Sequence, residues 1–192
     1  MTTQTVLDNL AAWLQSEITP QVTLKKAVMF GVAEDEGYSF ELVHPAVYVT
    51  TFPRTAAEHE KADDDRPILA PAIIVYSSGM STINTATGAT ETPITFLVQT
   101  WNPGKHDIIT NEAGEKVPAF RVDAEGWRDL ACFVDKIISA LAQAELPGGL
   151  AISTAIDFTL PDVEENNFYP YYRSEITFTV THYKRLQAKF NI

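Results

Sequence analysis

YRSEITFTVTHY, residues 172–183, alternates apolar and polar side chains. Ile176, Phe178 and Val180 fall on one side, and Glu175 and the threonines fall on the other, because successive side chains of a strand point to opposite faces. This period predicts a strand with one face buried and the other in water. Burial on one face is typical of an antiparallel sheet.

Further strand patterns occupy much of the chain before this segment. Alternating or apolar runs that are bounded by Gly, Pro or acidic turns are expected to form strands. They lie at residues 25–32, 38–43, 45–53, 70–79, 93–101 and 149–161. The first two flank the acidic turn AEDEG and predict a hairpin. In the strand predicted at 93–101, Ile94, Phe96 and Val98 fall on one face, and Leu97, Gln99 and Trp101 fall nearer the other.

Two segments carry helical periodicity instead. In residues 5–18 apolar residues repeat at intervals of three and four, and Thr5 with Asp8 resembles a capping box. A second helix is expected at residues 123–144, with Asp123 as its N-cap. Its predicted buried stripe consists of Trp127, Leu130, Ala131, Val134, Ile137, Ile138 and Leu141.

The order helix, strands, helix, two strands predicts one α+β domain over residues 1–192. We expect a mostly antiparallel sheet with both helices packed on one face. Residues 54–70, 80–92 and 104–120 are polar or rich in turn formers and are expected to form exposed loops or arms. The last of these predicts an extended β-hairpin arm that turns at residues 111–114. Because a lone hairpin is marginal in water, this arm must pack on something.

Composition restricts the functional class. Fourteen Lys and Arg against 25 Asp and Glu give a formal net charge of −11. This charge opposes tight binding to nucleic-acid phosphates or anionic membranes, although DNA can still slide past such a surface. No apolar run reaches the roughly 18 residues of a membrane-spanning helix, and the N-terminus lacks a secretory pattern. Cys132 lies in the second helical pattern, where we expect a small buried hydrophobe rather than a nucleophile.

Motifs of catalysis are missing from the sequence. It has no Gly-x-Ser-x-Gly elbow, phosphate loop, dinucleotide fingerprint or His-Glu-x-x-His pair. Ser77-Ser78-Gly79 is interpreted as a strand-to-loop turn, and the four histidines have no spacing that sets two on one helical face. Two acidic runs are interpreted as surface carboxylates. They are Asp63, Asp64, Asp65, Glu164 and Glu165. We therefore expect no catalytic residue, metal or cofactor.

An aromatic cluster crowds around Pro170, directly before the last strand. It consists of Phe168, Tyr169, Tyr171 and Tyr172. Tyr and Trp carry large apolar area with a polar group and are enriched in interfaces. We interpret this cluster, together with Trp101, as a candidate subunit or partner interface. The alternative is that one or two tyrosine rings fold back over the end of the sheet.

Four segments resemble those of tail terminator and tail completion (head–tail joining) proteins of long-tailed bacteriophages. They are VLDNLAAWLQSEI (6–18), TFLVQTWN (95–102), GWRDLACFVDKIISAL (126–141) and DFTLPDVEENNFYPYYRSEITFTV (157–180). The resemblance implies an α+β subunit of a homo-oligomeric ring, typically a hexamer, that caps the finished tail tube and presents a surface to the head connector. The segments 54–70 and 104–120 depart from the family pattern and leave the particular neck component open.

The same resemblance implies partners and a location. The partners are the tail tube protein and the head–tail connector protein, and the location is the host cytoplasm during assembly and then the tail or neck of the virion. DNA is expected to pass the ring without tight binding, and the two acidic runs named above are candidates for an acidic lumen or surface. Two alternatives stay open. One is a small-molecule-binding or hydrolytic α+β domain with a pocket between the sheet and helix 123–144, and the other is a tail tube or neck-adaptor protein.

Overall fold

The two longest strands form the centre of the fold. In the computed structural model, β6 (Ala89–Trp101) and β11 (Tyr171–Tyr183) pair antiparallel along their whole length, from Trp101 opposite Tyr171 to Ala89 opposite Tyr183. The structure describes residues 2–27, 40–50, 70–121, 125–143, 145–159 and 171–183.

Shorter strands extend this pair into a seven-stranded sheet in the order β10-β11-β6-β4-β3, in which β5 also pairs with β6 and β9 with β11. The added strands are β3 (Ala46–Val49), β4 (Ala72–Tyr76), β5 (Thr82–Ile83), β9 (Ala151–Ile152) and β10 (Asp157–Thr159). All the pairs are antiparallel except β3 with β4, which run parallel. The prediction of a mostly antiparallel α+β fold is confirmed, while the parallel pair was not foreseen.

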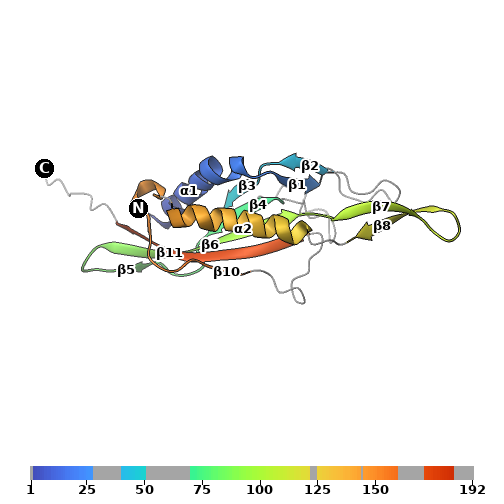
Figure 1. Cartoon of the computed structure of the whole chain (residues 1–192). Coiled ribbons are helices and arrows are strands. Elements are labelled where there is room, and N and C mark those ends of the chain that lie inside the picture. The colour runs from blue at the N-terminus through green and yellow to red at the C-terminus, as the bar shows by residue number, and fades with distance from the viewer. Residues whose placement is uncertain are drawn as a thin grey trace, which may run out of the picture.

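Both helices, α1 (Thr3–Trp13) and α2 (Glu125–Gln143), cover the same face of this sheet (Figure 1). The expected alternation holds, because Ile176, Phe178 and Val180 of β11 lie in one core with both helices. The other buried residues that this sheet contributes to the core are Ile73, Val75, Ile94, Phe96, Val98 and Tyr172. Phe96 and Phe178 meet edge to face, with 5.1 Å between ring centroids.

The first helix begins earlier than the capping-box pattern predicts. The N-cap is Thr2, whose Oγ1 accepts a hydrogen bond from the Thr5 backbone N–H at 3.2 Å. Thr5 is therefore inside the helix and is not its cap. After Trp13 the chain continues as a π-helical turn over Leu14–Ile18 and a 3-10 turn over Thr19–Gln21.

The buried stripe of α2 agrees only in part with the predicted one. Its fully buried large side chains are Leu130, Phe133, Val134, Ile137 and Leu141. Trp127 and Ile138 pack against the core while partly exposed. The expectation that Cys132 is buried is wrong, since Cys132 is exposed. It stands two residues from Leu130 and from Val134, and two residues turn an α-helix by more than half a circle, onto the opposite side.

Two further hairpins are two-stranded sheets of their own. The first pairs β1 (Leu24–Ala27) with β2 (Phe40–Val43), as expected, and its predicted turn lies outside the described residues. The second pairs β7 (Lys105–Thr110) with β8 (Lys116–Arg121) and confirms the predicted arm. In Figure 1 this β7–β8 arm extends away from the body, beyond the start of α2.

The segment 80–92 is not the loop that the sequence suggested. β5 pairs with β6 there, and β6 already begins at Ala89, with Thr90 and Thr92 buried. Asn84 shapes the turn, because its Oδ1 accepts hydrogen bonds from two backbone N–H groups, at 3.0 and 3.2 Å. The acidic segment 54–70 lies, except for Ala70, outside the described residues. Within the described part of the chain, no helix is long and apolar enough to cross a membrane.

Candidate assembly arm and its root

The β7–β8 arm leaves the body through residues 102–104, which follow the last residue of β6. Asn102 is buried here, and both ends of its amide are hydrogen-bonded. Its Nδ2 donates to Asp129 Oδ2 at 2.6 Å, and its Oδ1 accepts from the Gly104 N–H at 2.9 Å. The second bond turns the chain tightly between β6 and β7, and Gly104 has a φ of 75°, a conformation that favours glycine.

Lys25 of β1 joins the same cluster. Its Nζ donates to Asn102 Oδ1 at 3.2 Å and lies 3.8 Å from Glu125 Oε2, and it also stands 5.2 Å from the centre of the Phe40 ring. The cluster of Lys25, Asn102, Gly104 and Asp129, here called the arm root, therefore joins β1, the β6–β7 connection and α2. Charge-assisted bonds of this kind are stronger than neutral ones, especially when partly buried.

The aromatic residues near the root face inward. Tyr172 is 3% exposed; it packs edge to face on Trp127 of α2 with centroids 4.9 Å apart, and its ring also lies against Gly126. Trp101, opposite Tyr171 in the sheet, is 1% exposed. Neither Trp101 nor Tyr172 offers exposed area to a partner, so these two do not fit the predicted contact surface. Tyr172 instead packs on Gly126 and Trp127 in the first turn of α2, and Asp129 follows at the start of the next turn.

The other predicted interface and acidic residues are distributed differently. Tyr171 is half-buried at the start of β11. Those that lie outside the described residues are Asp63, Asp64, Asp65, Glu164, Glu165, Phe168 and Tyr169. The contact surface and the acidic lumen remain predictions at those positions.

The tip of the arm, residues 111–115, is a well-bonded turn. Asn111 Oδ1 accepts from the N–H groups of Ala113 and Glu115, at 3.0 and 2.9 Å, and Gly114 has a φ of 82°. The turn exposes the carboxylates of Glu112 and Glu115, and Ile109 beside it is 50% exposed. The tip thus presents negative charge next to an apolar side chain.

Several polar side chains away from the arm root make local hydrogen bonds. Ser77 Oγ donates toward the carbonyls of Pro93 and Gly79, at 2.9 and 3.1 Å, and His44 Nδ1 donates to the carbonyl of Val22 at 2.8 Å. His182 is buried beside Thr92, with 3.5 Å between Nε2 and Oγ1. The described part of the chain holds no group of three or more His, Cys, Asp and Glu side chains placed to bind a metal ion.

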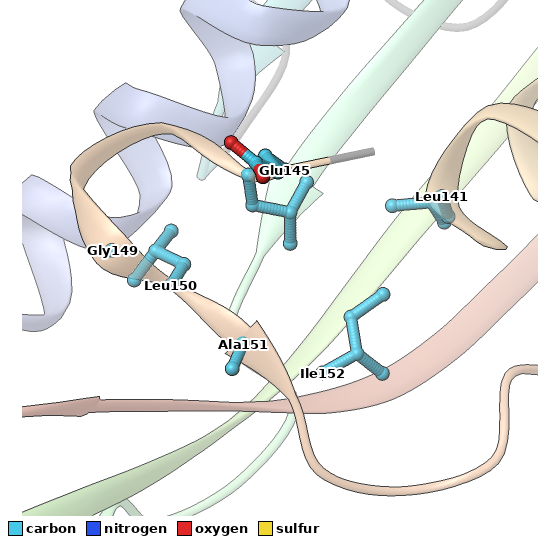
Figure 2. Close-up of a pocket in the computed structure, with 7 residues that line it drawn as sticks. Leu141, Glu145, Gly149, Leu150, Ala151 and Ile152 are labelled. Carbon is cyan, nitrogen blue, oxygen red and sulfur yellow. The ribbon is translucent and has the colours of Figure 1, made fainter. Parts of the chain in front are cut away.

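A shallow hollow lies where α2 ends (Figure 2). The residues that line it are Leu141, Glu145, Leu146, Gly149, Leu150, Ala151 and Ile152. In Figure 2 Leu141 of α2 and Ile152 of β9 lie on one side of the hollow, across from Leu150. It differs from the expected pocket between helix 123–144 and the sheet, because that space is filled by core side chains such as Phe133 and Ile137. Apart from the carboxylate of Glu145, the side chains that line the hollow are aliphatic.

Sequence reasoning missed the arm root. The Asn102-Pro103-Gly104 run is a local turn signal. However, Lys25 and Asp129 stand 77 and 27 residues from Asn102, and no local pattern connects them. No protein-family model matches the chain, and no curated protein is significantly similar to it in sequence.

Proposed function

We propose that the protein is a structural assembly protein of a long-tailed bacteriophage or prophage. In this role it is a tail terminator or tail completion protein, which forms a ring that caps the tail tube and joins it to the head connector. The observation that carries the proposal is the β7–β8 arm, a separate two-stranded sheet that projects from an α+β body and is held at its base by the arm root.

The physics of a lone hairpin supports an assembly role. Two strands alone bury little apolar surface and are marginal in water, so such an arm gains stability by packing on another surface. The arm root fixes the direction in which the arm leaves the body, and a segment that is already oriented loses less entropy on binding. An arm that meets a different patch on the next subunit makes a heterologous contact, the kind that generates rings.

The net charge agrees with a ring around DNA. At −11 per subunit, a ring repels phosphates, so that DNA slides through without sticking. Electrophoresis of the assembled ring with linear DNA checks this point. Retention of the DNA at about 0.15 M salt, where charges are screened beyond about 8 Å, contradicts it.

The decisive experiment uses polymerised tail tubes made from the tail tube protein of the same genome. We expect the wild-type protein to bind tube ends and stop elongation, as seen by negative-stain electron microscopy. The matched variant replaces residues 107–119 with a short Gly-Ser turn. Because the arm is a sheet of its own, this variant should keep a cooperative thermal unfolding transition near the wild-type melting temperature and lose end binding. Tubes that elongate equally with and without the wild-type protein contradict the proposal.

One observation favours a second candidate, a small-molecule-binding domain, with the binding site shifted from the expected pocket to the hollow of Figure 2. Its aliphatic lining and single carboxylate suit an apolar amine. A thermal-shift screen of alkyl amines tests this candidate. A rise in melting temperature that Glu145→Gln abolishes supports it, and no shift with any amine rejects it.

A further inference from the structure

The outward face of α2 carries two exposed cations, Arg128 and Lys136. The other exposed residues in the middle of this face are Cys132, Asp135 and Ser139, and the partly exposed Glu125 and Asp129 lie beside them. Two cations therefore stand in solvent on one helix face of a chain whose total charge is −11.

Arg128 and Lys136 also differ from the other basic side chains that the structure describes. Lys25 is bonded at the arm root, Lys26 pairs with Glu41 at 2.9 Å, and Arg173 Nε donates to Gln99 Oε1 at 3.1 Å. Arg128 and Lys136 have no such partner within the described residues. They stand eight positions apart, about 12 Å along the helix.

The arm tip has the opposite charge. Glu112 and Glu115 are exposed, and Glu115 accepts one hydrogen bond from Asn111 Nδ2 at 3.2 Å, while Glu112 has no partner among the described residues. Both carboxylates stand on the same short turn, and the tip therefore carries a net charge of −2.

The tip cannot reach α2 of its own chain. β7 has six residues, which span about 20 Å at 3.3 Å per residue. α2 starts beside the arm root and runs in the other direction (Figure 1). Within one molecule, the arm tip and the outward face of α2 are therefore too far apart to contact each other.

We infer that the arm tip of one copy docks on the outward face of α2 of a second copy, with Glu112 and Glu115 against Arg128 and Lys136. The partner is another molecule of this same chain, and the contact is heterologous, so repetition closes a ring. The biological meaning of the contact rests on the proposed ring function. Exposed ion pairs are individually weak, so the association depends on ionic strength and on the avidity of closure.

Charge exchange between the two surfaces tests this contact. The tip-reversed variant is Glu112→Lys with Glu115→Lys, and the helix-reversed variant is Arg128→Glu with Lys136→Glu. We expect the wild type to associate in sedimentation velocity at low salt and each variant alone to bind itself at least about tenfold more weakly. An equimolar mixture of the two variants should regain association, because each lysine tip then meets an acidic helix and each acidic tip meets a basic helix.

A matched control separates the contact from the total charge. Glu91→Lys with Asp157→Lys changes the net charge as much as the tip reversal does, on β6 and β10, and should leave association unchanged. A wild type that stays monomeric at low salt, a tip-reversed variant that still associates, or a mixture that does not recover each overturns the inference. Tube capping is a separate measurement. If the protein caps tubes but stays monomeric in solution, only the inferred contact is refuted. If the protein forms a ring through these residues but does not bind tube ends, only the proposed function is refuted.

Discussion

The ring of Tyr172 fills the space that a side chain on Gly126 would need. A Cβ atom added to Gly126 would overlap Cε2 and Cζ of the Tyr172 ring. The glycine therefore lets β11 and the first turn of α2 approach closely, and the edge-to-face contact of Tyr172 with Trp127 follows from that approach.

Gly126→Ala should destabilise the protein, although alanine is the better helix former by about 1 kcal/mol. Overpacking at such a contact costs about 1–3 kcal/mol, which chemical denaturation measures as a lower free energy of unfolding. The double variant with Tyr172→Ala checks the cause, because the two losses should then be less than additive. If the losses in free energy of unfolding are additive, an alanine at position 126 does not clash with the Tyr172 ring.

Phe133 and Cys132 are neighbours in sequence on α2, the first buried and the second exposed, and they make a matched pair. Phe133→Ala removes a fully buried ring and should lower the free energy of unfolding by about 3–5 kcal/mol. Cys132→Ala removes an exposed thiol and should change it by less than about 0.5 kcal/mol. Similar losses for the two variants would contradict the orientation of this helix.

Asn102→Ala should loosen the arm at its root. The change removes three hydrogen bonds and leaves Asp129 without its Asn102 partner, at a cost of about 1–3 kcal/mol. Hydrogen exchange should speed up at Gly104 and along β7 and β8. Asn84→Ala is the control, because its two bonds lie in the β5–β6 turn and faster exchange should stay there. Unchanged protection of the arm in Asn102→Ala would show that the root does not hold it.

His182 should make the fold sensitive to mild acid. Burial lowers the pKa of His182 below its ordinary value. The unfolded chain therefore takes up the proton more readily, so stability is complete above the ordinary pKa of about 6.5 and falls as pH decreases below it. Urea unfolding at a series of pH values measures this loss. His182→Gln should show a flatter dependence between about pH 7 and about pH 5, and an equal slope in both proteins would contradict the assignment.

Local periodicity explains why much of the fold was predictable from sequence. The alternation at Ile176, Phe178 and Val180 gave the correct buried face, and the turn formers after Thr110 located the arm. Both are properties of consecutive residues. The parallel pairing of β3 with β4 is different, because it depends on how two distant segments meet.

The candidate site was harder to foresee for the same reason. The aromatic residues near Tyr172 indicated a contact surface. Composition does not reveal, however, whether an aromatic side chain is buried in the core of its own subunit or exposed to a partner. The Tyr172 ring can be buried because Gly126, 46 positions earlier in the sequence, has no side chain at the place that the ring occupies. Similarly, the importance of Asn102 appears only when Lys25 and Asp129 are seen beside it.

The continuity of β6 with β7 has a mechanical consequence. A pull on the arm passes through residues 102–104 into β6, whose thirteen residues are all paired with β11. Tension in that direction loads the rungs of this ladder together, in shear, and does not peel them apart singly. The protein is thus built to withstand traction applied at its outermost point.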